Sequence, residues 1–164
     1  MRILNILKYV LILGFLVILT FFLMLKFNVG KSEVPVNQEV QQDVQTEYSH
    51  EVALSGIPIK VEFADTKAKQ AQGLSGRSGL KEDEGMLFVF DRPFAYKFWM
   101  KDMNFAIDMI WFNKDKKRIY IEKNATPESY PTLFGPNQEA LYVLETASGW
   151  SDRHNIKVGD TLEF

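Results

Sequence analysis

Alternating apolar and polar positions predict a β-rich domain in the second part of the chain. From Ile57 to Phe63, apolar side chains occupy every second position, which is the period of a strand with one buried face. Val52 and Leu54, followed by Ser55-Gly56, predict the preceding arm of a hairpin. Further apolar segments at 86–90, 107–112, 118–123 and 141–144 are expected to form strands, and a last strand is expected to end at Phe164.

Helix and loop signals interrupt these strands. Asp65 or Thr66 can cap a short helix that ends near Gly73, and residues 149–154 predict a single helical turn. Prolines and a glycine make residues 126–137 a predicted loop. Short strands separated by turns, with one or two short helices, predict a mainly β domain in the form of a small barrel or sandwich.

The first 27 residues follow a different pattern. No charged residue occurs from Tyr9 to Leu25, and nearly every side chain in this run is large and apolar. Such a run matches the roughly 20 residues that a helix needs to cross a bilayer, and Lys8 and Lys26 lie at its two ends. Residues 1–27 are therefore predicted to form an uncleaved transmembrane signal-anchor. A cleaved signal peptide is the alternative, but it has a shorter core and a small-residue cleavage site that this chain lacks.

The rest of the chain divides into a tether and a domain. Residues 28–50 are polar, without a sustained period, and are predicted to be flexible, whereas residues 51–164 have the size of one domain. The positive-inside bias is slight, with Arg2 and Lys8 on one side and Lys26 and Lys31 on the other. The default for a single N-terminal anchor predicts a single-pass protein of the cell membrane with its C-terminal domain outside the cytoplasm.

Composition narrows the chemistry. The chain has no cysteine, two histidines and a formal net charge of -2. Disulfides are therefore impossible, and neither a metal site nor a cofactor is expected. The charges of the β domain nearly cancel, without the basic footprint of a nucleic-acid-binding protein. A phosphate loop, a dinucleotide fingerprint and a nucleophile elbow are all missing from the sequence, which favours a protein that is not an enzyme.

The segment around Trp99 is the first candidate for ligand binding. If Tyr96 to Met100 forms a strand, then Lys97, Trp99 and Lys101 share one face. A tryptophan between two lysines suits a sugar ring, a carboxylate or a peptide. The alternative interpretation is that Trp99 packs over the lysine stems on the surface of the protein itself.

Three charged residues extend this candidate site. Asp108 precedes an apolar strand and, if buried, needs a partner such as Lys101 or Arg77; it is interpreted as a cap for loop amides in preference to a general base or a ligand anchor. Glu145 ends a strand and could face Asp108 across a cleft, as the paired carboxylates of glycosidases do. Arg77, in a Gly-Arg-Ser-Gly turn, could clamp an anion or tie its loop to a neighbouring acid.

A series of short motifs in a fixed order resembles the family of domain of unknown function 192 (DUF192). The motifs are Asp83-Glu84-Gly85-Met86-Leu87-Phe88-Val89-Phe90, Phe98-Trp99-Met100-Lys101, Asp108-Met109-Ile110, Tyr142-Val143-Leu144-Glu145 and Ile156-Lys157-Val158-Gly159-Asp160. The resemblance spans Ile57 to Glu163 and implies a compact, mainly β domain, often behind an export signal or anchor, without implying a reaction. Met103 and Ala106 stand where the family usually has Thr and Pro, which alters either a pocket wall or only its loop.

These observations lead to three functional hypotheses. The first is a membrane-tethered extracytoplasmic binding module for an envelope saccharide, a small anion or a protein, with Trp99, Lys101, Asp108, Arg77 and Glu145 as the candidate ligand-binding residues. The second is a hydrolase that uses the carboxylate pair Asp108 and Glu145. The third is a structural or assembly protein of the envelope.

Overall fold

A computed structural model describes residue 48 and residues 50–164. The predicted transmembrane segment and all but the end of the predicted tether lie outside these described residues. Within residues 48 and 50–164, no helix has the length and apolar character that crossing a bilayer requires.

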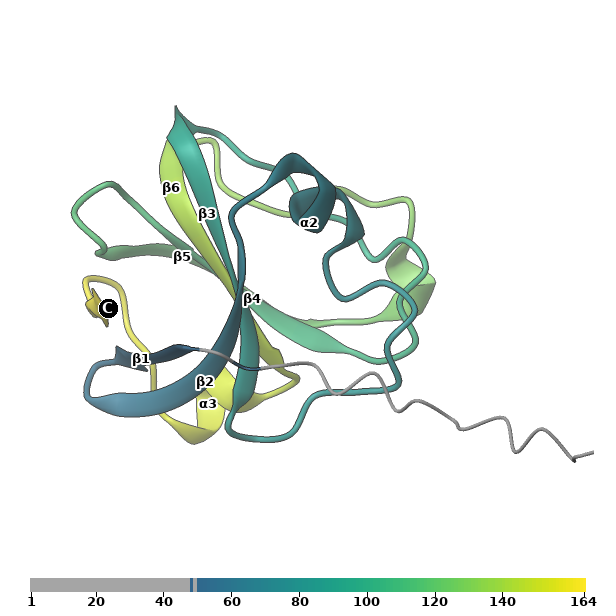
Figure 1. Ribbon diagram of the computed structural model, residues 1–164, viewed down its shortest axis with the longest axis horizontal. Helices are drawn as coiled ribbons and strands as arrows, with labels where there is room; N and C mark the ends of the chain where they lie inside the picture. Colours follow the sequence, from purple (N-terminus) through teal and green to yellow (C-terminus); the bar gives the residue numbers. More distant parts are fainter. Residues whose placement is uncertain (1–47, 49) are drawn as a thin grey trace, which may run out of the picture. The chain divides into compact units, whose positions relative to one another are not determined.

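The described residues fold around one curled sheet, a half-barrel of seven strands in the order β5-β4-β6-β3-β2-β1-β7 (Figure 1). The strands are β1 (His50–Leu54), β2 (Ile57–Ala64), β3 (Glu84–Phe94), β4 (Ile107–Phe112), β5 (Arg118–Ala125), β6 (Ala140–Ala147) and β7 (Leu162–Glu163). Two short helices, α2 (Lys67–Gln72) and α3 (Trp150–Arg153), and the 3-10 turn η1 (Pro127–Ser129) complete the fold. The mainly β prediction with two short helices is confirmed, in the form of one continuous sheet.

The two edge strands of the sheet meet at one end. Lys117, just before β5, forms an isolated bridge with Thr161, just before β7. The amide of Arg118 donates to the carbonyl of Asp160 at 2.8 Å, and the amide of Leu162 donates to the carbonyl of Lys116 at 2.9 Å. These hydrogen bonds stabilise the curled shape of the sheet, because they pair backbone N–H and C=O groups of the edge strands that would stay unpaired in a flat sheet.

The first part of the domain forms as the sequence predicts. β1 and β2 are an antiparallel hairpin around Ser55 and Gly56, both of which adopt positive φ. β2 and β3 then pair in parallel, so the chain needs a crossover, and α2 supplies it. Thr66 caps α2 by accepting from the amide of Lys69 at 3.3 Å, and Gly73 ends the helix with a φ of 51°.

The structure corrects two expectations about the middle of the chain. β3 does not stop at Asp91 but continues through Pro93 to Phe94, because a bulge lets the strand rejoin β6 where Phe94 pairs with Ala140. The segment from Tyr96 to Met100 is not a strand. Only Phe98 bridges to another segment, exchanging backbone hydrogen bonds with Phe134 at 2.9 and 2.8 Å.

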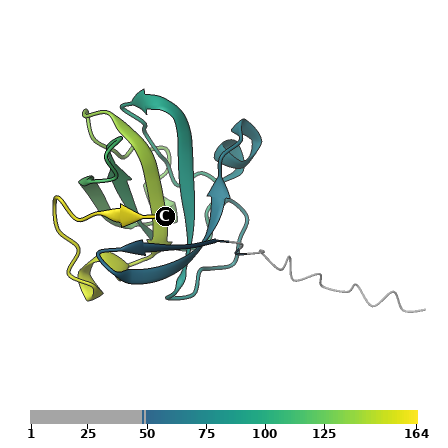
Figure 2. The same ribbon diagram turned by 60° about the vertical axis from the view of Figure 1, so that its left-hand side comes forward.

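Side chains alternate between the two faces of the sheet, and each face has its own hydrophobic cluster. We call one side the α3 face; it carries Leu87, Ile110 and Leu144 and packs against Trp150 of α3. We call the other side the α2 face; it carries Met86, Phe88, Met109, Trp111 and Val143 and packs against Leu74, which follows α2. Figure 2 shows α2 on one side of β3 and the C-terminal strand β7 on the other.

Candidate functional site

A pocket of about 160 Å³ opens on the α2 face of the sheet. It lies between α2 with the loop that follows it and the irregular segment after β3. The residues that line it are Gln70, Ala71, Gln72, Gly73, Leu74, Ser75, Phe88, Phe90, Tyr96, Lys97, Phe98, Trp99, Met103 and Glu145. The side-chain Nε2 of Gln70 donates to the carbonyl of Val89 at 2.8 Å and so fixes α2 beside β3.

Aromatic rings set at right angles form one corner of the pocket. The ring of Phe98 stands at 85° to the rings of both Phe88 and Phe90, with centroid distances of 4.8 and 6.4 Å. Trp99 is half exposed, and its ring meets the edge of Tyr130 at 5.7 Å. The lining combines these aromatic rings with several polar side chains, those of Gln70, Gln72, Ser75, Lys97 and Glu145. Aromatic walls with placed polar groups are typical of a small-ligand site.

Glu145 is the one carboxyl among the residues that line the pocket. Its side chain is 5% exposed, and its flanking strand neighbours are Met86 and Met109. Among the described residues, no group hydrogen-bonds its Oε2 atom. Burial raises the pKa of Glu145 to about 8, although the positive charge of Arg77 acts in the opposite direction. At neutral pH this carboxyl is therefore mostly protonated and uncharged.

Lys97 in the lining and Arg77, whose charge acts on Glu145, already have oxygen partners. Arg77 forms an ion pair with Glu62, with 2.5 Å between Nη2 and Oε2. The Lys97 ammonium donates to the carbonyls of Gly135 and Pro136 at 2.5 and 2.8 Å, and so holds the loop before β6 in place. Arg77 thus ties its loop to an acid, one of the two roles expected of it.

Asp108 lies on the opposite, α3 face and is completely buried. Its Oδ1 accepts from the amides of Asn124 and Gly149 at 2.9 and 3.0 Å, and its Oδ2 accepts from the amide of Ser151 at 2.9 Å. Asp108 therefore caps loop amides, as the preferred interpretation of the sequence holds. Its partners are backbone groups instead of Lys101 or Arg77.

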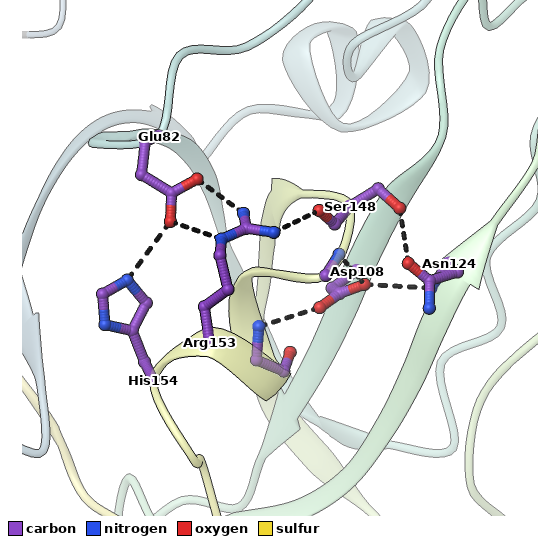
Figure 3. Close-up of polar contacts among 8 residues, drawn as sticks. Glu82, Asp108, Asn124, Ser148, Arg153 and His154 are labelled. Carbon is purple, nitrogen blue, oxygen red and sulfur yellow. Dashed lines mark hydrogen bonds and ion pairs between the residues drawn. The ribbon is translucent and has the colours of Figure 1, made fainter.

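A polar network surrounds this cap and braces α3 (Figure 3). The hydroxyl of Ser148 donates to Oδ1 of Asn124 at 2.6 Å, and Arg153 donates to the carbonyl of Ser148 at 3.1 Å. Arg153 also binds both carboxylate oxygens of Glu82, at 2.9 and 2.5 Å, and His154 lies 3.3 Å from the same carboxylate. The network joins β5, the end of β6 and the loop before β3 around α3, so its geometry is that of a structural corner.

Strand register separates the two carboxyls that the hydrolase hypothesis requires together. In the β4–β6 pair, Met109 lies opposite Glu145, and Asp108 lies opposite Thr146. Because directly paired residues share a face, Asp108 and Glu145 point to opposite sides of the sheet. They do not flank one site as the two acids of a glycosidase do.

The structure brings Trp99 and Glu145 into one pocket but leaves Lys101 outside its lining. The side chain of Lys101 is half exposed, and its Nζ lies 3.9 Å from Oδ2 of Asp102. Met103, the departure from the family pattern, lies in the pocket wall. Sequence reasoning missed Phe90 and Phe98 as wall residues, although the density of aromatic residues between 86 and 99 was a signal for them.

The family and the solved structures that this chain resembles have descriptions that name no reaction. The DUF192 family, described as uncharacterized ACR, COG1430, matches residues 50–164. A crystal structure of a protein of unknown function from Novosphingobium aromaticivorans is similar, with 33% identity, a TM-score of 0.66, and coverage of 70% of this chain and 84% of that one. A "putative transcription regulator" from Sinorhizobium meliloti is 32% identical, with a TM-score of 0.66 and coverage of 69% and 91%. No curated protein matches this chain.

Proposed function

The chain belongs to the DUF192 family, and from that premise we propose that its β domain is an extracytoplasmic binding module, held at the membrane by residues 1–27. The observation that carries the binding proposal is the aromatic pocket on the α2 face with the buried carboxyl of Glu145 in its lining. The observation that carries the location is the uncharged apolar run from Tyr9 to Leu25.

The size of the pocket limits what it can hold. An apolar cavity of about 150 Å³ is known to accept benzene, and this pocket has a volume of about 160 Å³. The ligand is therefore a small envelope molecule, or the exposed end of a larger one, that inserts a ring-sized group. Half-exposed Trp99 lies where the remainder of such a ligand would emerge.

The chemistry of the lining supports binding in preference to catalysis. Its residues include one carboxyl and no histidine or cysteine. The hydroxyl of Ser75 in the lining donates to the carbonyl of Lys101 at 2.9 Å, without a general base beside it to activate it. Asp108, which the hydrolase hypothesis needs, is engaged on the other face of the sheet.

Tryptophan fluorescence tests the binding proposal. The full-length chain in a non-ionic detergent is titrated with N-acetylglucosamine, benzyl alcohol, benzoate and benzylammonium. Trp111 and Trp150 are completely buried whereas Trp99 is half exposed at the pocket, so a ligand-dependent change reports mainly on Trp99. We expect at least one of these compounds to change the fluorescence in a saturable way.

Two matched substitutions on α2 localise the effect. Ala71 lines the pocket and Ala68 does not, and both side chains are exposed. Ala71→Phe is expected to fill the pocket and abolish binding, whereas Ala68→Phe is expected to bind as the wild type does. If no compound produces a signal, or if Ala71→Phe binds normally, the pocket is not the binding site.

Protease added to intact cells tests the location. The proposal predicts digestion of the β domain from outside while a cytoplasmic marker protein remains intact. A domain that stays protected until the cells are lysed contradicts the extracytoplasmic placement and leaves the pocket proposal unaffected.

A further inference from the structure

We propose that the pocket receives a protonated amine, with the ammonium group of the ligand at the carboxyl group of Glu145 and its apolar part against the rings of Phe88, Phe90 and Phe98. This inference rests on the proposed binding function and specifies the chemical class of the ligand. The ligand class is an organic ammonium that retains at least one N–H and carries a ring-sized apolar group.

The first argument is the unsatisfied carboxyl oxygen. A buried polar atom without a hydrogen bond costs stability, and native proteins rarely retain one without a reason. Only 5% of Glu145 is exposed, and its strand neighbours Met86 and Met109 offer no donor side chain. Oε2 of Glu145 has no hydrogen-bond partner among the described residues. An N–H donor carried by a ligand in the pocket would give this carboxyl group a hydrogen-bond partner.

The second argument is the charge around that oxygen. The groups in and beside the pocket are engaged elsewhere: Arg77 with Glu62, the Lys97 ammonium with backbone carbonyls, and the Tyr96 hydroxyl with the carbonyl of Arg92 at 2.8 Å. The strands on either side place only methionines beside Glu145 on this face. A positively charged donor is the group that stabilises a carboxylate in such surroundings.

The third argument is the aromatic corner. Phe88 and Phe90 lie nearly parallel, at 19° with centroids 6.5 Å apart, and Phe98 stands perpendicular to both. Phe90 also stacks on Tyr96, with ring centroids 3.5 Å apart, so this corner is a wall of aromatic rings. Such a wall suits the apolar substituent of the ligand, and aromatic rings attract a nearby cation. A neutral alcohol would match the shape without gaining charge pairing, and an anion would meet the carboxyl without a complementary charge.

Binding of an ammonium ligand is expected to release a proton, which distinguishes it from binding of a neutral ligand. Near neutral pH the empty site holds Glu145 as the neutral acid, because burial raises its pKa to about 8. Binding of the ammonium then forms the carboxylate–ammonium pair and releases the Glu145 proton to solvent. The amine keeps its own protons, so one proton leaves for each ligand bound below this pKa.

Isothermal titration calorimetry on the full-length chain in a non-ionic detergent tests this proton release. Benzylammonium, benzyl alcohol and benzoate share one ring and differ in charge. Titrations at about pH 6 and about pH 8, in buffers with different ionisation enthalpies, count the protons released. Because only the ionised site binds the ammonium, we expect benzylammonium to bind about fiftyfold more tightly at the higher pH, and to release close to one proton at the lower pH.

Two isosteric substitutions complete the test. Glu145→Gln is expected to remove the proton release, the pH dependence and the preference for benzylammonium over benzyl alcohol. Benzyl alcohol binding to this variant shows that the pocket is still formed. Glu163→Gln, at an exposed carboxylate on β7, is expected to behave as the wild type.

The possible results separate the two proposals. Benzyl alcohol or benzoate binding as tightly as benzylammonium, or an ammonium affinity that does not change with pH, overturns the amine assignment and leaves the pocket as a binding site. Failure of all three compounds and of N-acetylglucosamine to bind overturns both proposals.

Discussion

Asp108 and Glu145 are buried carboxyls on neighbouring strands, one residue out of register, and the structure treats them in opposite ways. Asp108 on the α3 face accepts three backbone hydrogen bonds and holds the loops around α3. Glu145 on the α2 face has an oxygen without a partner among the described residues and lines a pocket. The two carboxyl groups are therefore almost equally buried but differ completely in their hydrogen bonding.

The difference shows how a sheet can separate stability from binding. On the α3 face both oxygens of the Asp108 carboxylate accept hydrogen bonds from the protein itself, so this carboxylate is engaged in holding the fold. On the α2 face the cover consists of a short helix with no buried residue, the loop that follows it and the irregular segment after β3, and the carboxyl of Glu145 lies in the pocket between them. A polar group that is buried at a cost and not satisfied is a better indicator of function than one that is buried and fully bonded.

The largest expected effect on stability comes from removing the Asp108 carboxylate, which is fully hydrogen-bonded. Asp108→Ala leaves one buried amide, that of Ser151, and two partly buried amides, those of Asn124 and Gly149, without their acceptor. We therefore expect the free energy of unfolding to fall by about 3–5 kcal/mol. Urea denaturation followed by tryptophan fluorescence measures the change. Asp91→Ala, at an exposed carboxylate, should stay within about 0.5 kcal/mol of the wild type. A loss of less than about 1 kcal/mol for Asp108→Ala would show that the three bonds contribute little.

Glu145, whose Oε2 has no partner among the described residues, is expected to have a smaller effect on stability, and this effect depends on pH. The pKa of Glu145 is about 8 in the folded state against an ordinary value of 4.5. Between these values the folded protein holds a proton that the unfolded chain has lost, so this group lowers stability as pH rises, by up to about 1.4 kcal/mol per pH unit. Its contribution is fully present below pH 4.5 and is lost as pH rises through about 8.

Glu145→Gln sharpens this prediction because the amide cannot titrate. The difference in unfolding free energy between wild type and variant should shift in favour of the variant as pH rises from about 6 to about 8, by roughly 2–3 kcal/mol. Denaturant titrations at several pH values measure it, with Glu163→Gln as the variant that should follow the wild type. Parallel curves for wild type and Glu145→Gln would mean that Glu145 is ionised in the folded state.

The smallest effect concerns the cover of the pocket. Thr66→Ala removes the side-chain cap of α2, and we expect a loss of about 1 kcal/mol, since Thr66 accepts from the amide of Lys69. Hydrogen exchange should rise in residues 67–72 and change little on the α3 face. Thr132→Ala, at an exposed loop position, serves as the control. Equal acceleration on both faces would show that α2 does not open independently of the sheet.

Several elements of this fold could be predicted from local sequence patterns. The β1–β2 hairpin, the cap at Thr66 and the end of α2 at Gly73 all follow from short-range signals, and the structure has them as expected. Asp108 could be interpreted as a cap for loop amides because it stands at the start of a buried strand. The end of β3 was predicted wrongly: the apolar run ends at Phe90, but pairing with β6 beyond a bulge extends the strand to Phe94.

The residues that line the pocket could not be predicted from local sequence patterns alone. Trp99 could be proposed from its polar and aromatic surroundings, and it does line the pocket, whereas Lys101, only two residues away, does not. The relation of Asp108 to Glu145 depended on the register between β4 and β6, where a shift of one residue changes the face on which a side chain lies.

The order of apolar and polar residues thus determined which segments become strands, where the chain turns and which residues are buried, because these choices depend on the period of the backbone and on neighbours close in sequence. Only the tertiary structure decided which buried residues meet. The parallel crossover through α2, the curl of the sheet and the β4–β6 register place one acid among backbone amides and the other beneath aromatic rings. Contacts between segments far apart in the chain made that choice.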